Sequence, residues 1–496
     1  MNSHQPLEGW YSWYEAHLIS DEGLNILGGT FPGGVTIFHG VNEHLGWAHT
    51  VNHVDLSDVY QLEMHPENPL QYRYDDQWLT LDEKVYRAKL NLFAGIKIPI
   101  KRKVYQSIYG PTFKTDQSFF AWRYVVAQDI RAVEQWYRMN KAKNFEQFKA
   151  ALEMQAIPST NIVYADRNDN IFFISNAKVP VRDTNYVWRE VVPGNTSATL
   201  WDSYYPLDSL PQVLNPASGY VYNTNNTPFS SSSETFNPAE KDLNFTMSYQ
   251  RPDMENSRSI RFQELIEQYD SLSYEDFKRI KFDRQYGDEI QTREMLNLDI
   301  LFHIEAQQYP EYADLIEKLS TWNRQFDIEN TTAPLFIYMV QKLIGDLRDQ
   351  DRYCWRCTIA EEDIIKVLAK TKDYFIEKYG GYEVALGDFQ RHTRGEISLP
   401  LGGGPDVLAA MHSQEQEDGT FRGMAGESYI ELVRFSDEGV EIETVHAYGS
   451  SAEPDSPHYT DQMELFVKQQ LKPMTLDKNK VLEQAKSLYS PKKVIK

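Results

Sequence analysis

The order of hydrophobic patterns along the chain predicts an α+β fold. Residues 1–130 consist mostly of short β-branched and aromatic runs, residues 258–380 carry apolar side chains at helical spacing, and strand patterns return from Ile397 to Tyr448. This order favours one large layered unit over residues 1–496 with a mainly helical insertion, rather than independent domains. With 41% hydrophobic residues, a chain of 496 residues can build a large core.

Five runs illustrate the expected strands. β-branched and aromatic side chains lie between glycine, proline and Asn/Asp at residues 34–38 and 121–126, and again at residues 162–166, 170–174 and 219–222. Each run is therefore expected to form a strand.

Helices are expected between the two strand regions. Val133, Trp136 and Tyr137 fall on one helical face. Asn144, followed three residues later by Gln147, is typical of the N-cap pair that begins a second helix.

The second half begins with a loop and continues with helices. Residues 227–237 are rich in serine, which predicts a mobile surface segment. Within the helical insertion, the runs at residues 261–266 and 363–368 show the expected apolar spacing.

The charge of the chain argues against some partners. Fifty Lys and Arg residues against 72 Asp and Glu give a formal net charge of −22, which opposes binding to nucleic acid or to an anionic membrane surface. No apolar run reaches the 18 residues that a membrane-spanning helix requires. Neutral or small partners are therefore expected.

The amino-terminal sequence and the two cysteines say little about location or metal binding. The amino end lacks the charged and apolar segments of a secretory signal, so export cannot be predicted from this chain. Cys354 and Cys357 are its only cysteines, and they lack the further ligands that a structural zinc needs. A local disulfide or two free thiols is expected.

Several motifs follow one another along nearly the whole sequence. They are Asn2-Ser3-His4, Phe31-Pro32-Gly33, Gly46-Trp47-Ala48-His49-Thr50-Val51, Gln106-Ser107-Ile108-Tyr109-Gly110-Pro111, Asn223-Thr224-Asn225-Asn226, Leu401-Gly402-Gly403-Gly404 and Ser456-Pro457-His458-Tyr459. In this order they resemble the penicillin acylase family of N-terminal-nucleophile amidohydrolases, and the first sixty residues resemble the start of its catalytic chain. The resemblance implies an αββα sandwich, in which two stacked antiparallel sheets lie between helical layers.

The resemblance also implies that the nucleophile lies outside the printed sequence. In the family, the attacking serine is the first residue of the mature catalytic chain, about one β-hairpin upstream of the segment matching His4, and residues 1–496 do not include that hairpin. The chain alone is therefore expected to be inactive. Its expected partners are the upstream segment and the small subunit of the same precursor. Ser3 falls in register with a non-nucleophile position and is rejected as the nucleophile.

Four residues are expected to form the remaining machinery by the same resemblance. The backbone N–H of Val51 and the side-chain amide of Asn225 would stabilise the oxyanion of the tetrahedral intermediate. His4 would orient the nucleophile's amine or its bridging water, and Arg258 would polarise the floor of the site. Asn225 could instead be an ordinary turn asparagine, and His4 and Arg258 could be solvated bystanders.

No cofactor is expected for catalysis, although a structural calcium is possible. Asp55 and Asp58 offer hard oxygen ligands where family members often hold calcium, and the alternative is a pair of solvated loop acids. The expected substrate is a small N-acylated molecule such as an acyl-homoserine lactone, a penicillin or an acyl-peptide. The family implies a periplasmic or secreted location.

Two alternative functions remain open. His49, His53, Asp55 and Asp58 include suitable zinc ligands, so a zinc-dependent hydrolase is a rival, although His49 and His53 lie in a strand-and-loop segment where they need not converge. A non-enzymatic reading is an inactive remnant or a binding subunit with the same fold.

Overall fold

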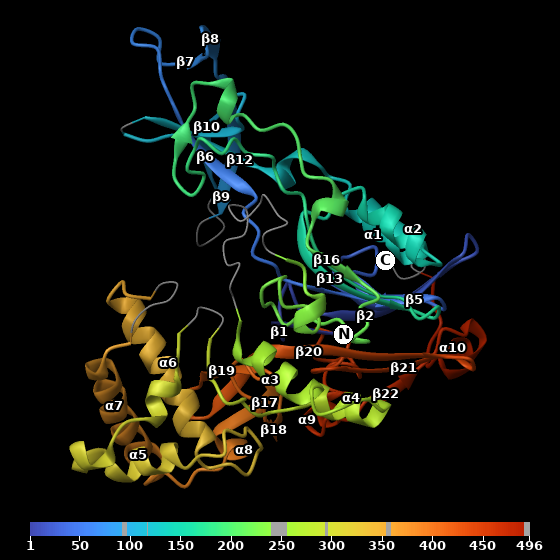
Figure 1. Cartoon of the computed structure of the whole chain (residues 1–496), viewed down its shortest axis with the longest axis vertical. Coiled ribbons are helices and arrows are strands. Elements are labelled where there is room, and N and C mark those ends of the chain that lie inside the picture. The colour runs from blue at the N-terminus through green and yellow to red at the C-terminus, as the bar shows by residue number, and fades with distance from the viewer. Residues whose placement is uncertain (92–96, 117, 240–254, 293–295, 354–358, 491–496) are drawn as a thin grey trace.

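Two mainly antiparallel sheets lie face to face between helical layers in the computed structural model (Figure 1). The structure describes residues 1–91, 97–116, 118–239, 255–292, 296–353 and 359–490. Helices α1 and α2 cover the outer side of one sheet, and α3, α4 and α9 lie along the outer side of the other. This is the αββα arrangement that the resemblance implied.

The first sheet has seven strands in the order β16-β14-β13-β5-β4-β3-β2. The strands are β2 (Tyr14–Ser20), β3 (Leu24–Thr30), β4 (His39–Val41), β5 (Leu45–Thr50), β13 (Ser159–Asp166), β14 (Ile171–Ala177) and β16 (Gln212–Leu214). Its outer face packs on α1 (Ala132–Lys141) and α2 (Phe145–Leu152), where Trp47, Phe148 and Tyr164 join one buried cluster.

The second sheet is organised around one long strand. It comprises β1 (Asn2–Pro6), β17 (Gln390–Arg394), β18 (Ile397–Pro400), β19 (Met411–Glu415), β20 (Phe421–Ser436), β21 (Gly439–His446) and β22 (Lys472–Met474). The 16-residue β20 pairs with β1, β17, β19 and β21, so the amino-terminal strand is held inside this sheet by residues more than 400 positions away.

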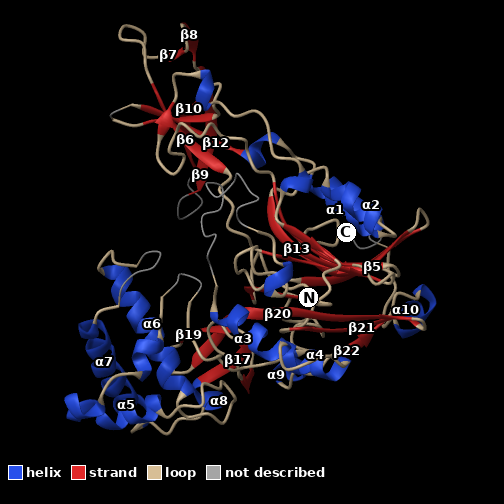
Figure 2. Cartoon of the chain, in the orientation of Figure 1, coloured by secondary structure: helices blue, strands red, loops and turns tan. Residues whose placement is uncertain are grey.

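A third sheet forms an arm that extends from the sandwich (Figure 2). Its order is β15-β6-β12-β11-β10-β9, and a separate hairpin, β7-β8, lies beyond it. The strands are β6 (Ser57–Leu62), β7 (Gln71–Tyr74), β8 (Gln77–Thr80), β9 (Asp82–Asn91), β10 (Lys97–Gln106), β11 (Pro111–Lys114), β12 (Phe119–Tyr124) and β15 (Val192–Pro193).

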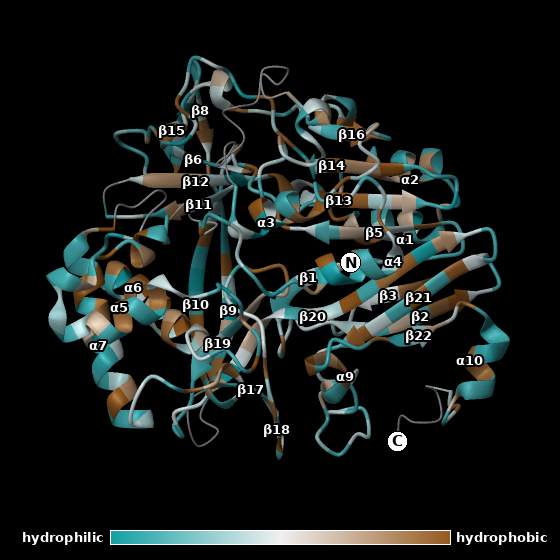
Figure 3. Cartoon of the chain, turned by 60° about the horizontal axis from the view of Figure 1, so that its bottom comes forward, coloured by the Kyte–Doolittle hydropathy of each residue, from teal (hydrophilic) through white to brown (hydrophobic). Residues whose placement is uncertain are grey.

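The expected helices between residues 258 and 380 are present. They are α3 (Ser257–Ile266), α4 (Tyr274–Lys281), α5 (Ala313–Ser320), α6 (Ala333–Asp349) and α7 (Glu361–Tyr379), followed along the chain by α8 (Leu386–Phe389), α9 (Met463–Val467) and α10 (Lys478–Gln484). Helices α5, α6 and α7 share a core of their own that includes Phe326, Phe336 and Phe375. Figure 3 shows apolar residues on the sheets and on these helices, and more polar colour along the outer loops.

The space between the two stacked sheets is partly polar. Leu27, Val41, Ile442 and Leu476 form a small buried apolar cluster there, with partly buried residues such as Val433 packed against it, while Glu431 on β20 is fully buried nearby. Burial raises the pKa of the Glu431 carboxyl from 4.5 to about 8, because the charged form loses its hydration. A polar interlayer is therefore built into this sandwich.

Three local expectations are wrong. Residues 34–38 are not a strand, because the Asn140 side chain bonds both the N–H and the carbonyl of Ile37 in place of a neighbouring strand. Residues 219–222 are also not a strand. The serine-rich loop is packed rather than mobile at the surface: Ser231 is fully buried, and its N–H and that of Ser232 donate to the Asn237 side chain.

The expected helix cap at Asn144 is present, and the strand expected at residues 121–126 is shorter than predicted. The Asn144 cap is confirmed, since its side chain accepts from the Gln147 N–H at the start of α2. Residues 121–126 form a strand only to Tyr124, where a 3₁₀ turn begins. Cys354 and Cys357 lie outside the described residues. Across the described ranges, none of the helices has the length and apolar character needed to span a membrane.

Candidate active site

The predicted oxyanion segment begins where β5 ends. Thr50 is the last residue of β5 and pairs with Asn161 on β13. Val51 therefore lies just beyond the end of this strand, and it is 58% exposed. The Val51 carbonyl accepts hydrogen bonds from the side chains of Asn161 at 3.2 Å and Asn225 at 3.1 Å. These bonds hold the peptide on the carboxyl side of Val51 and thereby orient this segment.

Asn225 lies in a turn that its asparagine neighbours build. The Asn223 side-chain oxygen accepts from the Asn225 N–H at 2.9 Å, and the Asn226 side-chain oxygen accepts from the Thr224 N–H at 2.9 Å. Asn225 has φ 66°, a left-handed conformation that asparagine tolerates better than most residues. The repeated asparagines therefore form a support for one strained position.

Arg258 fixes the orientation of the Asn225 amide. This arginine lies in the first turn of α3 and is 8% exposed, and its Nη1 and Nη2 both donate to Asn225 Oδ1 at 3.1 Å. Its Nε donates to Asp406 Oδ1 at 2.8 Å. Because a guanidinium can only donate, Oδ1 must face Arg258, and the Asn225 Nδ2 donor must face Val51.

His4 lies in an irregularity of the second sheet. The register of β1 against β20 shifts between Ser3 and Gln5, and such bulges often re-aim a side chain near an active site. Burial, followed by the charges of Arg258 and Lys281, lowers the pKa of His4 well below 6.5. The ring is therefore neutral at pH 7.

A buried ion pair supports His4 through Asn2. Lys281 at the end of α4 pairs with Glu427 on β20, and the Asn2 Nδ2 donates to the same carboxylate at 3.1 Å. That donation fixes the Asn2 amide, so Asn2 also presents Nδ2 to His4 Nε2, 3.2 Å away. His4 Nε2 is therefore an acceptor.

Ser3 has a structural environment. It is 8% exposed, its Oγ donates to the His49 carbonyl at 3.0 Å, and the same oxygen lies 3.3 Å from His39 Nδ1. The Ser3 hydroxyl therefore bridges β1 of the second sheet and β5 of the first.

The structure does not assemble the four residues of the rival zinc site. His49 Nε2 accepts from the indole N–H of Trp136 at 3.0 Å, and Asp58 pairs with Arg182. Within the described ranges, no group of three or more His, Cys, Asp or Glu side chains is placed to hold a metal ion. The zinc alternative therefore has no support in the geometry.

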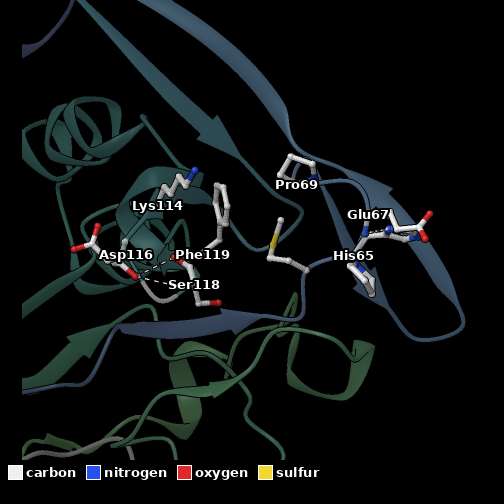
Figure 4. Close-up of a pocket in the computed structure, with 10 residues that line it drawn as sticks. His65, Glu67, Pro69, Lys114, Asp116, Ser118 and Phe119 are labelled. Atoms are coloured by element: carbon white, nitrogen blue, oxygen red, sulfur yellow. Dashed lines mark hydrogen bonds between the residues drawn. The ribbon is translucent and has the colours of Figure 1, made fainter.

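A separate pocket lies in the arm (Figure 4). It has a volume of about 340 Å³ and is lined by residues that follow β6 and residues of the β11–β12 turn, including His65, Glu67, Lys114 and Asp116. His65 Nδ1 accepts from the backbone N–H groups of Glu67 and Asn68, so this ring shapes its own loop. The pocket shares no residue with the site around Asn225.

The sequence predicted Val51, Asn225, His4 and Arg258 as site residues, but it did not predict the residues that support them in the structure. Asp406, Lys281 and Glu427 come from distant segments, and no local motif distinguishes them from ordinary surface charges. Asn161 carried no signal either, since it reads as one residue of a strand. Only Asn223 and Asn226 could have been noted, because they flank Asn225.

The chain is similar to known acylases over nearly its full length. The family model described as "Penicillin amidase" matches residues 1–483. The acyl-homoserine lactone acylase PvdQ of Pseudomonas fluorescens strain Pf0-1 is 24% identical over 516 residues, which cover 95% of this chain and 65% of that protein. The chain thus spans about two thirds of the length of the curated PvdQ relatives.

Two penicillin G acylases are also similar. The enzyme of Escherichia coli is 26% identical over 228 residues, covering 45% of this chain and 26% of that protein. The structure of a thermostable penicillin G acylase from Alcaligenes faecalis superposes with a TM-score of 0.67 at 17% identity, covering 99% of this chain and 95% of that one. At this identity the likeness shows the fold, which agrees with the layered sandwich.

Proposed function

The chain belongs to the penicillin amidase family, and from that premise we propose that it provides the oxyanion site and substrate scaffold for hydrolysing the linear amide of a small N-acylated molecule. The proposed substrates are of the acyl-homoserine lactone, penicillin or acyl-peptide type. PvdQ relatives carry the name acyl-homoserine lactone acylase, which makes that class the first to assay.

The orientation of the Asn225 amide carries this proposal. Arg258 holds Oδ1 from one side, so Nδ2 faces the Val51 segment at 3.1 Å from its carbonyl. In the reaction, the Val51 N–H and Asn225 Nδ2 would donate to the developing oxyanion, which a preorganised pair of donors stabilises more in the transition state than in the substrate. The neutral His4 ring would orient the nucleophile's amine or its bridging water.

We assign the attack to an N-terminal serine rather than to Ser3. Such a serine uses its own α-amine as the base, forms an acyl ester after the amine product leaves, and is regenerated by water. Ser3 is unsuited because its hydroxyl is buried and bonded to His49. No cofactor is needed for these steps. The small subunit of the same precursor and a periplasmic or secreted location remain part of this proposal.

The test compares two forms of the protein with a panel of N-acyl-homoserine lactones and penicillins. The 496-residue chain alone is expected to give no turnover, and the chain expressed together with the coding region upstream of Met1 is expected to release amine and show an acyl-enzyme burst. Turnover by the chain alone that persists after chelation and repurification would contradict the assignment. Inactivity of both forms would favour a binding subunit.

Arg258→Lys provides a smaller, separate prediction. Lysine keeps the positive charge but loses the fork that contacts Asn225 Oδ1 and Asp406 together. Losing one charged hydrogen bond, worth about 1.5 kcal/mol, should lower kcat roughly tenfold while KM changes little. Steady-state kinetics on the active form measure both. An equal rise in KM with unchanged kcat would show that Arg258 binds substrate instead of orienting Asn225.

A further inference from the structure

Arg182 lies where the resemblance places a calcium ion. Its side chain is 3% exposed, and its Nε donates to Asp58 Oδ2 at 2.9 Å. Its Nη1 donates to the backbone carbonyl of Asp55 at 3.1 Å, and its Nη2 is 3.7 Å from Asp55 Oδ1. One guanidinium therefore contacts both carboxylates and the carbonyl between them.

Neighbouring aromatic residues complete the surroundings of this group. The indole N–H of Trp201 donates to Asp58 Oδ2 at 2.7 Å, on the same oxygen that Arg182 contacts. The Arg182 guanidinium lies 5.7 Å from the centre of the Trp188 ring. Asp58 itself has no exposed side-chain surface. The cluster is thus a mostly buried site that holds a planar cation.

These residues do not fit a calcium ion. Calcium takes six to eight oxygen ligands at about 2.3–2.6 Å, and here the guanidinium fills the space that faces the available oxygens. A divalent ion at this position would also lie beside a fixed positive charge, which repels it strongly in a poorly hydrated site. In the described part of the chain, no third acidic side chain joins Asp55 and Asp58.

We infer that the Arg182 guanidinium is the resident cation of this site and replaces the divalent ion that the resemblance implies. A single arginine then neutralises Asp58 and ties the start of β6 to the segment that follows β14. Because Asp55 lies only four residues after Val51, the same contact anchors the segment that carries the proposed oxyanion donor. The chain gains from a side chain the support that a bound metal would otherwise provide.

The inference is tested on the full chain by thermal unfolding and elemental analysis. The wild-type Tm should be the same in EGTA and in millimolar calcium chloride, and the protein should contain no stoichiometric calcium. In Arg182→Ser, the Tm in EGTA should be lower by several degrees. Calcium should raise it again in this variant alone, because the removed side chain leaves Asp58 Oδ1, which has no hydrogen-bond partner among the described residues, and the Asp55 oxygens open to the ion.

Two further variants keep the outcome decisive. Arg138→Ser removes an exposed pair with Glu134 and should change the Tm little with or without calcium. Arg182→Lys keeps a charge and should stay insensitive to calcium, which gives a reading even where Arg182→Ser does not fold. A wild-type Tm that falls in EGTA, with that fall abolished by Asp58→Asn, would overturn the inference. A folded Arg182→Ser without any calcium response would show that Arg182 is an ordinary ion pair.

Discussion

We expect Asn225→Ala to lower kcat by roughly 10²–10³, about 3–4 kcal/mol, in the active form that the proposed function requires. The variant loses the Nδ2 donor that Arg258 aims toward Val51. KM should change little, because the donor acts mainly on the oxyanion that forms in the transition state. Steady-state kinetics and a thermal melt of the same preparation measure the two effects.

Two companion variants separate chemistry from backbone strain. Alanine is strained at φ 66°, whereas Asn225→Gly tolerates this angle and should lose the same factor in kcat with less change in Tm. Asn225→Asp keeps an oxygen for Arg258 but replaces the donor with an acceptor, so its kcat should fall by at least the same factor. If Asn225→Gly retained most of the activity, Asn225 would be a turn residue and not an oxyanion donor.

The free energy of unfolding should fall steeply as the pH drops from about 6.5 to about 4. Burial is the first cause that lowers the pKa of His49 and of His392 from 6.5 to about 4, so each ring stays neutral in the folded protein. Unfolded histidines titrate near pH 6.5, so the unfolded state binds more protons throughout this window. Each such ring contributes a loss of up to about 1.4 kcal/mol per pH unit.

Two further variants should shift this pH dependence in opposite directions. His392→Gln keeps a donor for the Ala447 carbonyl. Below pH 6.5 it should reduce the slope of the free energy of unfolding against pH by the equivalent of about one proton. Glu431 behaves oppositely: its folded pKa of about 8 lies above its unfolded value, so its stabilisation is present at low pH and is lost as the pH rises toward 8. In the wild type, the free energy of unfolding should decrease as the pH rises from about 4.5 to 8, and Glu431→Gln should remove the part of this decrease that comes from Glu431.

Urea titrations across this pH range give both slopes. Buried Asp58 and Glu255 also have raised pKa values and act in the same direction as Glu431, but His4, His39 and His446 add to the histidine effect. If His392→Gln left the slope below pH 6.5 unchanged, the His392 ring would be hydrated and charged in the native protein.

The sequence predicts the layers and the contacting residues better than their local geometry. Strand and helix regions could be predicted from side-chain periodicity, because each element must turn its apolar side chains toward the core. This holds for strand β13 and for helix α7. The strand prediction for residues 34–38 was wrong because the backbone of Ile37 bonds the side chain of Asn140 instead of a neighbouring strand. Asn140 lies about a hundred residues away, so a pattern of neighbouring residues cannot reveal this contact. The prediction that residues 227–237 form a surface loop was wrong because composition alone cannot show that Ser231 is buried.

The candidate site shows the same division. Asn225 and Arg258 were found as members of motifs, yet their mutual contact, which decides which amide atom faces the substrate, depends on folding across 33 residues of sequence. The calcium expectation rested on Asp55 and Asp58 and on the family resemblance at this position. Arg182 lies 124 residues beyond Asp58, so its place between the two acids could not be predicted from their spacing.

The long strand β20 has a consequence for hydrogen exchange. Residues 425–430 have β1 on one side, with β19 or β21 on the other, so their amides are enclosed between neighbours from three separate parts of the chain. Such an amide can exchange with deuterium only after an opening that separates several strands at once. Residues 425–430 should therefore exchange last, at a rate set by global unfolding, and the amides of β1 should follow the same time course although they lie at the opposite end of the sequence.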